Sequence, residues 1–163
     1  VIRGLRDAVA DEVLVVDSQG SNRAVSGSLF PTEAIRKGLA GIVVDGPCRD
    51  TRTIRQLDFP YYARSHTPYA GTTSNLGQTQ IPITCGGVTV NPGDILFGDD
   101  DGLVIATSEE LAAALPIAET IQHTESVMIG KMSDGTSFLD MLNFEAHCAA
   151  LAAGEPSSLQ FTV

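Results

Sequence analysis

The sequence predicts an α/β fold, and three observations carry this prediction. Two short β-branched runs, Val13–Val16 and Ile42–Val44, have the composition of strands that are buried on both faces. Helical periodicity separates the two runs, as in a parallel βαβ unit. From Ile83 to Ala106 the pattern changes to short strands joined by tight turns, which indicates antiparallel pairing.

The front of the chain is expected to alternate helices and strands. The strand from Gly41 should stop at Asp45-Gly46-Pro47, because Gly and Pro interrupt a strand ladder and favour a turn. The other predicted elements are the end of an amphipathic helix at 2–10, a helix at 32–40, a helical turn at 51–56, a strand at 61–64 and a loop at 65–80.

The rear of the chain is expected to be antiparallel and then helical. Strands are predicted at 83–90, 94–97 and 103–106. Helical sequence begins after Thr107, Pro116 should restart or kink it, and Ser137 should cap a last helix that ends near Ala153. No repeat or linker divides the chain, so residues 1–163 are predicted to form one domain with residues 107–154 as its helical extension.

Composition narrows the class of protein. Twenty acidic side chains stand against ten basic ones, a formal net charge of −10, which argues against a nucleic-acid surface. The apolar stretches are too short to cross a bilayer and no secretory signal opens the sequence, so no membrane association is expected. Cys48, Cys85 and Cys148 are widely spaced and fit a reducing compartment, which predicts the cytoplasm. Because the chain begins at Val1 rather than Met, we expect an amino-terminal segment to be missing.

Arg49 and Asp50 stand side by side just after the predicted strand from Gly41. A guanidinium beside a carboxylate at a strand end can bind an anionic substrate and a divalent cation together. The alternative is a surface ion pair that caps a loop, which would be expected of an arbitrary Arg-Asp dipeptide; the setting at a strand end favours the ligand site here. The helix after Gly27–Phe30 offers unpaired backbone N–H groups as an anion site, or is an ordinary helix start.

Other chemistries are disfavoured. Lys37 and Lys131 are expected on exposed helix surfaces, whereas a Schiff-base enzyme needs a desolvated lysine. The three histidines show no spacing for a shared metal site, and no nucleotide-binding glycine motif is present. Glu125 is expected on a solvated helix face.

Several segments taken together resemble a known family. They are Gly27–Phe30, Gly41–Asp50, Leu57–Arg64, Cys85–Asp94 and Gly98–Gly102. The family is that of regulator of ribonuclease activity A and the class II 4-hydroxy-4-methyl-2-oxoglutarate (4-carboxy-4-hydroxy-2-oxoadipate) aldolases, and the resemblance covers nearly the whole chain in the same order. It implies an RraA-like, three-layer β/β/α swivelling-domain fold (phosphohistidine-domain-like), assembled as a homotrimer or a dimer of trimers with active sites between subunits.

The resemblance also implies roles for particular residues. Asp50 corresponds to the protein ligand of Mg²⁺ or Mn²⁺, and Arg49 to the clamp on the pyruvyl carboxylate. Gly27 and the backbone N–H groups of Leu29 and Phe30 line the substrate site opposite the guanidinium. Glu125 corresponds to a catalytic carboxylate contributed by a neighbouring subunit.

Ser28 departs from the family, in which this position is commonly Asp or Glu. An acidic group there would orient metal-bound water and move protons, for which serine is a poor base. The sequence therefore predicts a metal-dependent lyase that acts on a small 2-oxo acid and yields pyruvate, and decarboxylation of oxaloacetate should persist better than aldol cleavage. The alternative is a protein without chemistry of its own that binds and regulates a ribonuclease.

Overall fold

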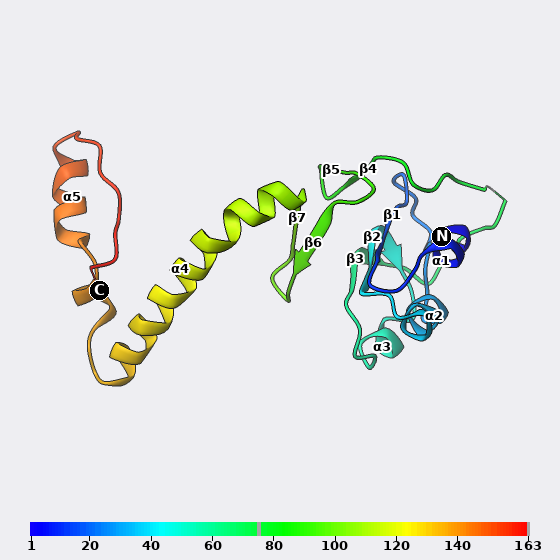
Figure 1. Ribbon diagram of the computed structural model, residues 1–163, viewed down its shortest axis with the longest axis horizontal. Coiled ribbons are helices and arrows are strands. Elements are labelled where there is room, and N and C mark those ends of the chain that lie inside the picture. Colours follow the sequence, from blue (N-terminus) through cyan, green and yellow to red (C-terminus); the bar gives the residue numbers. More distant parts are fainter. Residues whose placement is uncertain (75, 163) are drawn as a thin grey trace. The chain divides into compact units, whose positions relative to one another are not determined.

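The structure, a computed structural model, describes residues 1–74 and 76–162; Asn75, which lies in the predicted loop 65–80, and Val163 are outside the described residues. Contacts within the chain divide it into two compact units, Val1–Thr107 and Ser108–Val163, and each is described by itself. The elements of the first unit are α1 (Ile2–Asp7), β1 (Val13–Asp17), α2 (Leu29–Lys37), β2 (Gly41–Cys48), α3 (Thr51–Ile54), β3 (Tyr61–His66), β4 (Ile83–Cys85), β5 (Val88–Val90), β6 (Ile95–Gly98) and β7 (Leu103–Ala106) (Figure 1).

A three-stranded parallel sheet is the centre of the first unit, with β2 between β1 and β3. Ile42 and Val44 on one face of β2 pack with Ala34 of α2 and Leu5 of α1. Val43 on the other face packs with the hairpins, through Cys85, Val90 and partly buried residues of β6 and β7. Because consecutive strand residues point to opposite faces, one strand forms two separate cores. The result is the expected three-layer β/β/α arrangement, which is confirmed.

The predicted end of the strand at Asp45-Gly46-Pro47 is wrong, since β2 continues to Cys48. A shift of register against β3 between Val44 and Pro47 accommodates the irregular residues within the ladder. Gly46 is needed there because a Cβ atom would lie 2.1 Å from the Ser18 Oγ atom. The strand therefore carries Arg49 and Asp50 to the edge of the sheet.

Other boundaries also differ from the prediction; for example, α1 ends at Asp7 and β3 continues to His66. Helix α2 begins at Leu29, three residues before the predicted start, with Ser28 as its N-cap. The predicted strand 83–90 is instead a hairpin, because Gly86 (φ 62°) and Gly87 (φ 90°) turn the chain between β4 and β5.

The second unit consists of α4 (Ser108–Ser133), a short 3₁₀ helix η1 (Phe138–Met141) and α5 (Phe144–Ala152). Helix α4 is continuous through Pro116, and Ser137 caps η1 rather than a long last helix, through a hydrogen bond from the Leu139 N–H. Met128 and Met141 are the buried side chains of these helices. In the part of the chain that the structure describes, no helix is long and apolar enough to cross a membrane.

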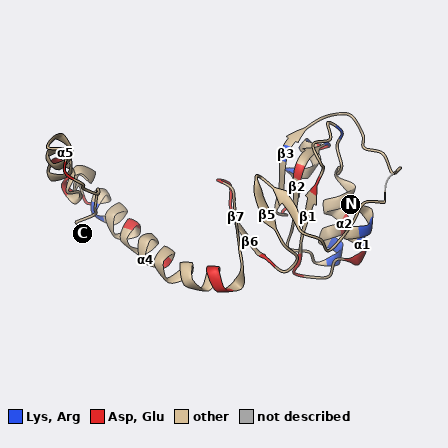
Figure 2. Cartoon of the chain, turned by 90° about the horizontal axis from the view of Figure 1, so that it is seen from above, with Lys and Arg blue, Asp and Glu red and all other residues tan. Residues whose placement is uncertain are grey.

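Charge is distributed unevenly along the sequence. Lys131 is the only basic residue of 108–163, which contains eight acidic residues. Four of the nine Lys and Arg residues of the first unit belong to α1 and α2, which are partly blue in Figure 2: Arg3, Arg6, Arg36 and Lys37. Most of the net negative charge of the chain therefore belongs to the second unit, because its acidic residues are almost unopposed by Lys or Arg.

Candidate functional site

Asp50 occupies a sharp corner between β2 and α3. Its backbone is left-handed (φ 59°), and its carbonyl oxygen accepts hydrogen bonds from the N–H groups of Thr53 (2.9 Å) and Ile54 (3.0 Å). Non-glycine residues adopt this conformation uncommonly, although Asp and Asn tolerate it best. The corner directs the Asp50 carboxylate toward the start of α2.

The Asp50 carboxylate is held from one side by Ser28. Its Oδ2 atom accepts hydrogen bonds from the Ser28 N–H (3.0 Å) and the Ser28 hydroxyl (3.3 Å). A carboxylate at the amino terminus of a helix is favoured by the exposed N–H groups and the helix dipole. Among the described residues, the second oxygen, Oδ1, has no hydrogen-bond partner, so one oxygen is oriented and the other is available to a ligand.

Gly27 allows this close approach. A Cβ atom on Gly27 would lie 2.5 Å from Asp50 Oδ2 and 2.8 Å from Arg49 Nε, closer than real Cβ contacts. Any side chain at this position would push the two charged groups apart from the helix start. The absence of a side chain at Gly27 is therefore required for the geometry of the site.

Arg49 is only loosely paired with its neighbour. Its Nε atom lies 3.7 Å from Asp50 Oδ2, and the two side chains are 44% and 40% exposed. Its backbone is fixed, since the Arg49 N–H donates to the Ser26 carbonyl oxygen (3.0 Å). An exposed pair at this separation is weak, so the guanidinium can bind an anion that arrives beside the carboxylate.

The donor set fits a divalent cation of the Mg²⁺ type. Among residues 1–74 and 76–162, no group of three or more His, Cys, Asp or Glu side chains could enclose a metal ion. Mg²⁺ is commonly held by one or two carboxylates and completes its coordination with water and substrate oxygens. Asp50, with one oriented and one open oxygen, can supply such a ligand to Mg²⁺ or Mn²⁺.

The structure brings the pair Gly27 and Ser28 beside the pair Arg49 and Asp50, although the two pairs are more than twenty residues apart in sequence. Leu29 opens α2 and is 77% exposed. The Phe30 N–H already donates to the Gly27 carbonyl oxygen (3.1 Å), so a ligand would have to compete for it. Glu125 lies exposed on α4, in the second unit. The roles of these residues remain predictions.

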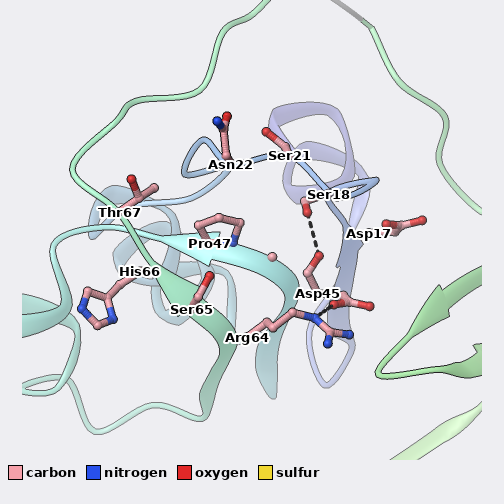
Figure 3. A pocket seen from close by; sticks show the side chains of 12 residues that line it. Asp17, Ser18, Ser21, Asn22, Asp45, Pro47, Arg64, Ser65, His66 and Thr67 are labelled. Carbon is pink, nitrogen blue, oxygen red and sulfur yellow. Dashed lines mark hydrogen bonds and ion pairs between the residues drawn. The ribbon is translucent and has the colours of Figure 1, made fainter.

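A second charged cluster lies at the same edge of the parallel sheet, where Arg64 of β3 lies beside Asp45 of β2 (Figure 3). The Arg64 Nε atom donates to Asp45 Oδ1, and the Gly86 N–H donates to Asp45 Oδ2 (3.0 Å). The hydrogen bond from Arg64 holds the pKa of the Asp45 carboxyl below its usual value, although burial acts in the opposite direction. Polar side chains of neighbouring loops and this cluster line a cavity of about 510 Å³.

The sequence pattern assigns Asp45 to a turn and does not reveal this cluster. The available signal was the position of Asp45, directly after the run Ile42–Val44, and of Arg64, the last residue of the predicted strand 61–64. Residues that follow parallel neighbours meet at one edge of the sheet.

The fold and the site define an α/β domain that presents a carboxylate and a guanidinium at the start of a helix. Comparison with known proteins places this domain in a family with the same kind of fold. The family model for RraA-like proteins, described as Aldolase/RraA, matches residues 1–105. The chain belongs to this family.

Two relatives and one solved structure illustrate the similarity. An uncharacterised protein of Methanocaldococcus jannaschii is 38% identical over 122 residues, which cover 75% of this chain and 59% of the relative. A protein of Halalkalibacterium halodurans named "Putative 4-hydroxy-4-methyl-2-oxoglutarate aldolase" is 33% identical over 135 residues, 82% of this chain and 64% of that protein. The structure of the RNA-processing inhibitor RraA from Thermus thermophilis matches with a TM-score of 0.60 and 36% identity, over 64% of each chain. The chain thus spans less than two thirds of the length of each.

Proposed function

We propose that this chain is the core of a divalent-metal-dependent lyase that cleaves or decarboxylates small 2-oxo acids and releases pyruvate. The observation that carries the proposal is the Asp50 carboxylate, anchored by Ser28 through one oxygen and open at the other, with the loosely paired Arg49 guanidinium beside it. The relative named as an aldolase supports the same reaction class.

When bound, the cation would withdraw electrons from the 2-oxo acid as the C3–C4 bond breaks, so that pyruvate leaves as its enolate. Asp50 would hold the cation and Ser28 would fix the orientation of that carboxylate. Arg49 would bind the substrate carboxylate, for which its planar donors are suited. Gly27 would keep both charged groups close to the start of α2. In a trimer or a dimer of trimers, Glu125 of a neighbouring subunit would complete the site as a carboxylate.

Ser28 bears on the choice of substrate. Its hydroxyl donates to Asp50, so it orients the carboxylate but provides no base of suitable pKa. Decarboxylation of oxaloacetate yields the same pyruvate enolate as aldol cleavage and requires less proton transfer. We therefore propose oxaloacetate as the better substrate of the two, in a cytoplasmic enzyme.

The test is pyruvate release from oxaloacetate, coupled to lactate dehydrogenase, with and without excess Mg²⁺, for the natural sequence and for Asp50→Ala. Metal-dependent release that is lost in the variant is the expected result. The same assay with 4-hydroxy-4-methyl-2-oxoglutarate measures aldol cleavage, which Ser28→Asp should increase relative to decarboxylation. Release at the uncatalysed rate in every sample would overturn the proposal.

A second candidate function is a regulator that binds a ribonuclease. The similarity to the RNA-processing inhibitor RraA favours it, as does the acidic second unit, which suits a basic partner. Binding to a ribonuclease that Arg49→Ala leaves unchanged, together with absence of pyruvate release, would favour this candidate over the lyase.

A further inference from the structure

Two hydroxyl groups are buried directly beneath the candidate site. Ser26 is 2% exposed, and its Oγ atom is fully enclosed. The Tyr61 phenol oxygen is enclosed as well, while the ring packs in the core between the sheet and α2. Neither oxygen has a hydrogen-bond partner among the described residues. Buried hydroxyls are normally paired, so two such oxygens in one core require an explanation.

The two hydroxyls are neighbours. Burial raises the pKa of the Tyr61 phenol to about 12, and the adjacent Ser26 hydroxyl acts against this rise. Cys48, whose side chain is also buried, is the third polar group at this place and influences the same phenol. The core under the site therefore contains a small polar cluster of Ser26, Cys48 and Tyr61 within otherwise apolar surroundings.

The backbone of this cluster is continuous with the site. Ser26 pairs with Cys48 in a parallel bridge, and the Ser26 carbonyl oxygen accepts the Arg49 N–H (3.0 Å). Ser26 precedes Gly27 and Ser28, and Cys48 precedes Arg49 and Asp50. A shift of Ser26 toward or away from Tyr61 would therefore change the position of the helix start relative to the charged pair.

We propose that Ser26 and Tyr61 are positioning residues whose hydroxyls are joined through one shared internal water molecule and thereby fix the Gly27–Ser28 segment against Arg49 and Asp50. An internal water needs several polar partners, which the two hydroxyls and the Cys48 thiol supply. Retaining two buried hydroxyls in an apolar core is costly unless they are paired. The metal-affinity part of the proposal rests on the proposed function, whereas the positioning of the backbone does not.

Amide hydrogen exchange measured by NMR on the metal-free chain tests the positioning directly. The reporters are the Ser28 N–H, bonded to Asp50, and the Arg49 N–H, bonded to Ser26. The Ala40 N–H, bonded to Glu12 (2.9 Å), serves as a distant reference. Ser26→Ala and Tyr61→Phe should each accelerate exchange at the reporters by about tenfold, the change expected from one net hydrogen bond, and leave the reference unchanged.

Three further variants sharpen the test. The double variant should show no larger effect than either single one, because both remove the same water-mediated link. Tyr62→Phe is the matched control, since its phenol donates to the Asp99 carbonyl oxygen (2.9 Å) on the hairpin side of the sheet and should not alter the reporters. Ser26→Cys keeps most of the volume and replaces Ser26→Ala if that variant does not fold.

Mn²⁺ binding, followed by electron paramagnetic resonance, gives a second readout without turnover. Each single variant should weaken binding about tenfold, the lower end of what residues that orient metal ligands contribute. Exchange that is unchanged, or that rises equally at the reference, would overturn the proposal, as would multiplied effects in the double variant. If the natural chain neither binds Mn²⁺ nor releases pyruvate, the proposed function fails while the exchange experiment still decides the positioning.

Discussion

The chain contains two Arg–Asp pairs at one edge of the same sheet, and they are built differently. Asp45 is 13% exposed and both of its carboxylate oxygens are engaged, by Arg64 and by the Gly86 N–H. Asp50 is 40% exposed and its Oδ2 atom lies 3.7 Å from the Arg49 Nε atom, while its Oδ1 atom has no hydrogen-bond partner among the described residues. A carboxylate with both oxygens hydrogen-bonded within the protein stabilises the fold. A carboxylate that is oriented through one oxygen can use the other oxygen to bind a ligand. We therefore assign a structural role to the Asp45–Arg64 pair and a ligand-binding role to the Asp50–Arg49 pair.

The largest expected effect is on metal binding at the open pair. Asp50→Asn keeps an acceptor for the Ser28 N–H but removes the charge, so Mn²⁺ affinity should fall by more than about 100-fold, beyond what residues that merely orient ligands contribute. Isothermal titration calorimetry measures it. Asp94→Asn is the matched control, because Asp94 also accepts a backbone N–H, from Asn91 (2.7 Å). Equal Mn²⁺ affinity in the two variants would show that Asp50 is not a metal ligand.

Gly27→Ala should be the next most damaging change. The new methyl group would meet Asp50 and Arg49 at distances that force both side chains to move, so pyruvate release should fall by about 10- to 100-fold. Gly130→Ala on α4 is the control, since a Cβ atom there meets nothing within 4 Å. Unchanged turnover in Gly27→Ala would show that the close approach does not matter for the site.

The two arginines should separate binding from stability. Arg49→Lys retains charge but loses the planar donor pair, so KM for the 2-oxo acid should rise about tenfold with a smaller change in kcat. Arg64→Lys should leave KM unchanged and lower the unfolding temperature. Steady-state kinetics and thermal unfolding of both variants give the comparison, and identical behaviour would contradict the assigned roles.

The smallest expected effect concerns stability in acid. The pKa of Asp45 is lowered in the folded protein, mainly by the hydrogen bond from Arg64. Its ionised form therefore favours folding above the unfolded value of about 3.9, and this contribution disappears as the pH falls through the folded pKa. Asp45→Asn should lower the free energy of unfolding by about 1–2 kcal/mol at pH 7, a discounted value because Arg64 is exposed.

The difference between Asp45→Asn and the natural chain should shrink as the pH approaches 3, in urea unfolding followed by circular dichroism. A difference that is constant over this range would mean that the ionisation of Asp45 does not contribute. Asp50→Asn offers the contrast, because an exposed and weakly paired carboxylate should change stability little.

Much of the fold followed from local patterns. Ile42–Val44 was recognisable as a strand buried on both faces because both faces of a central parallel strand are apolar. Val13–Val16 has the same composition and is a strand as predicted, but it is the edge strand β1 and is only partly buried. The end of β2 was not predictable in this way. Gly and Pro usually stop a strand, but here β3 shifts its register between Val44 and Pro47 and the ladder continues. Similarly, Gly86 and Gly87 divide the predicted strand 83–90 because their positive φ angles favour a turn that hydrophobic alternation alone does not reveal.

The sequence by itself determined the order of the elements, the apolar faces of the strands and the adjacency of Arg49 and Asp50, because these depend on neighbouring residues. Only the tertiary structure decided that Ser28 orients Asp50, that Gly27 must lack a side chain, and that Asp45 is completed by Arg64 and Gly86. These contacts join residues some twenty to forty positions apart, so they depend on how the sheet aligns its strands. The distinction between the structural carboxylate of Asp45 and the functional carboxylate of Asp50 therefore comes from the fold, because it depends on which carboxylate oxygens find a hydrogen-bond donor within the protein.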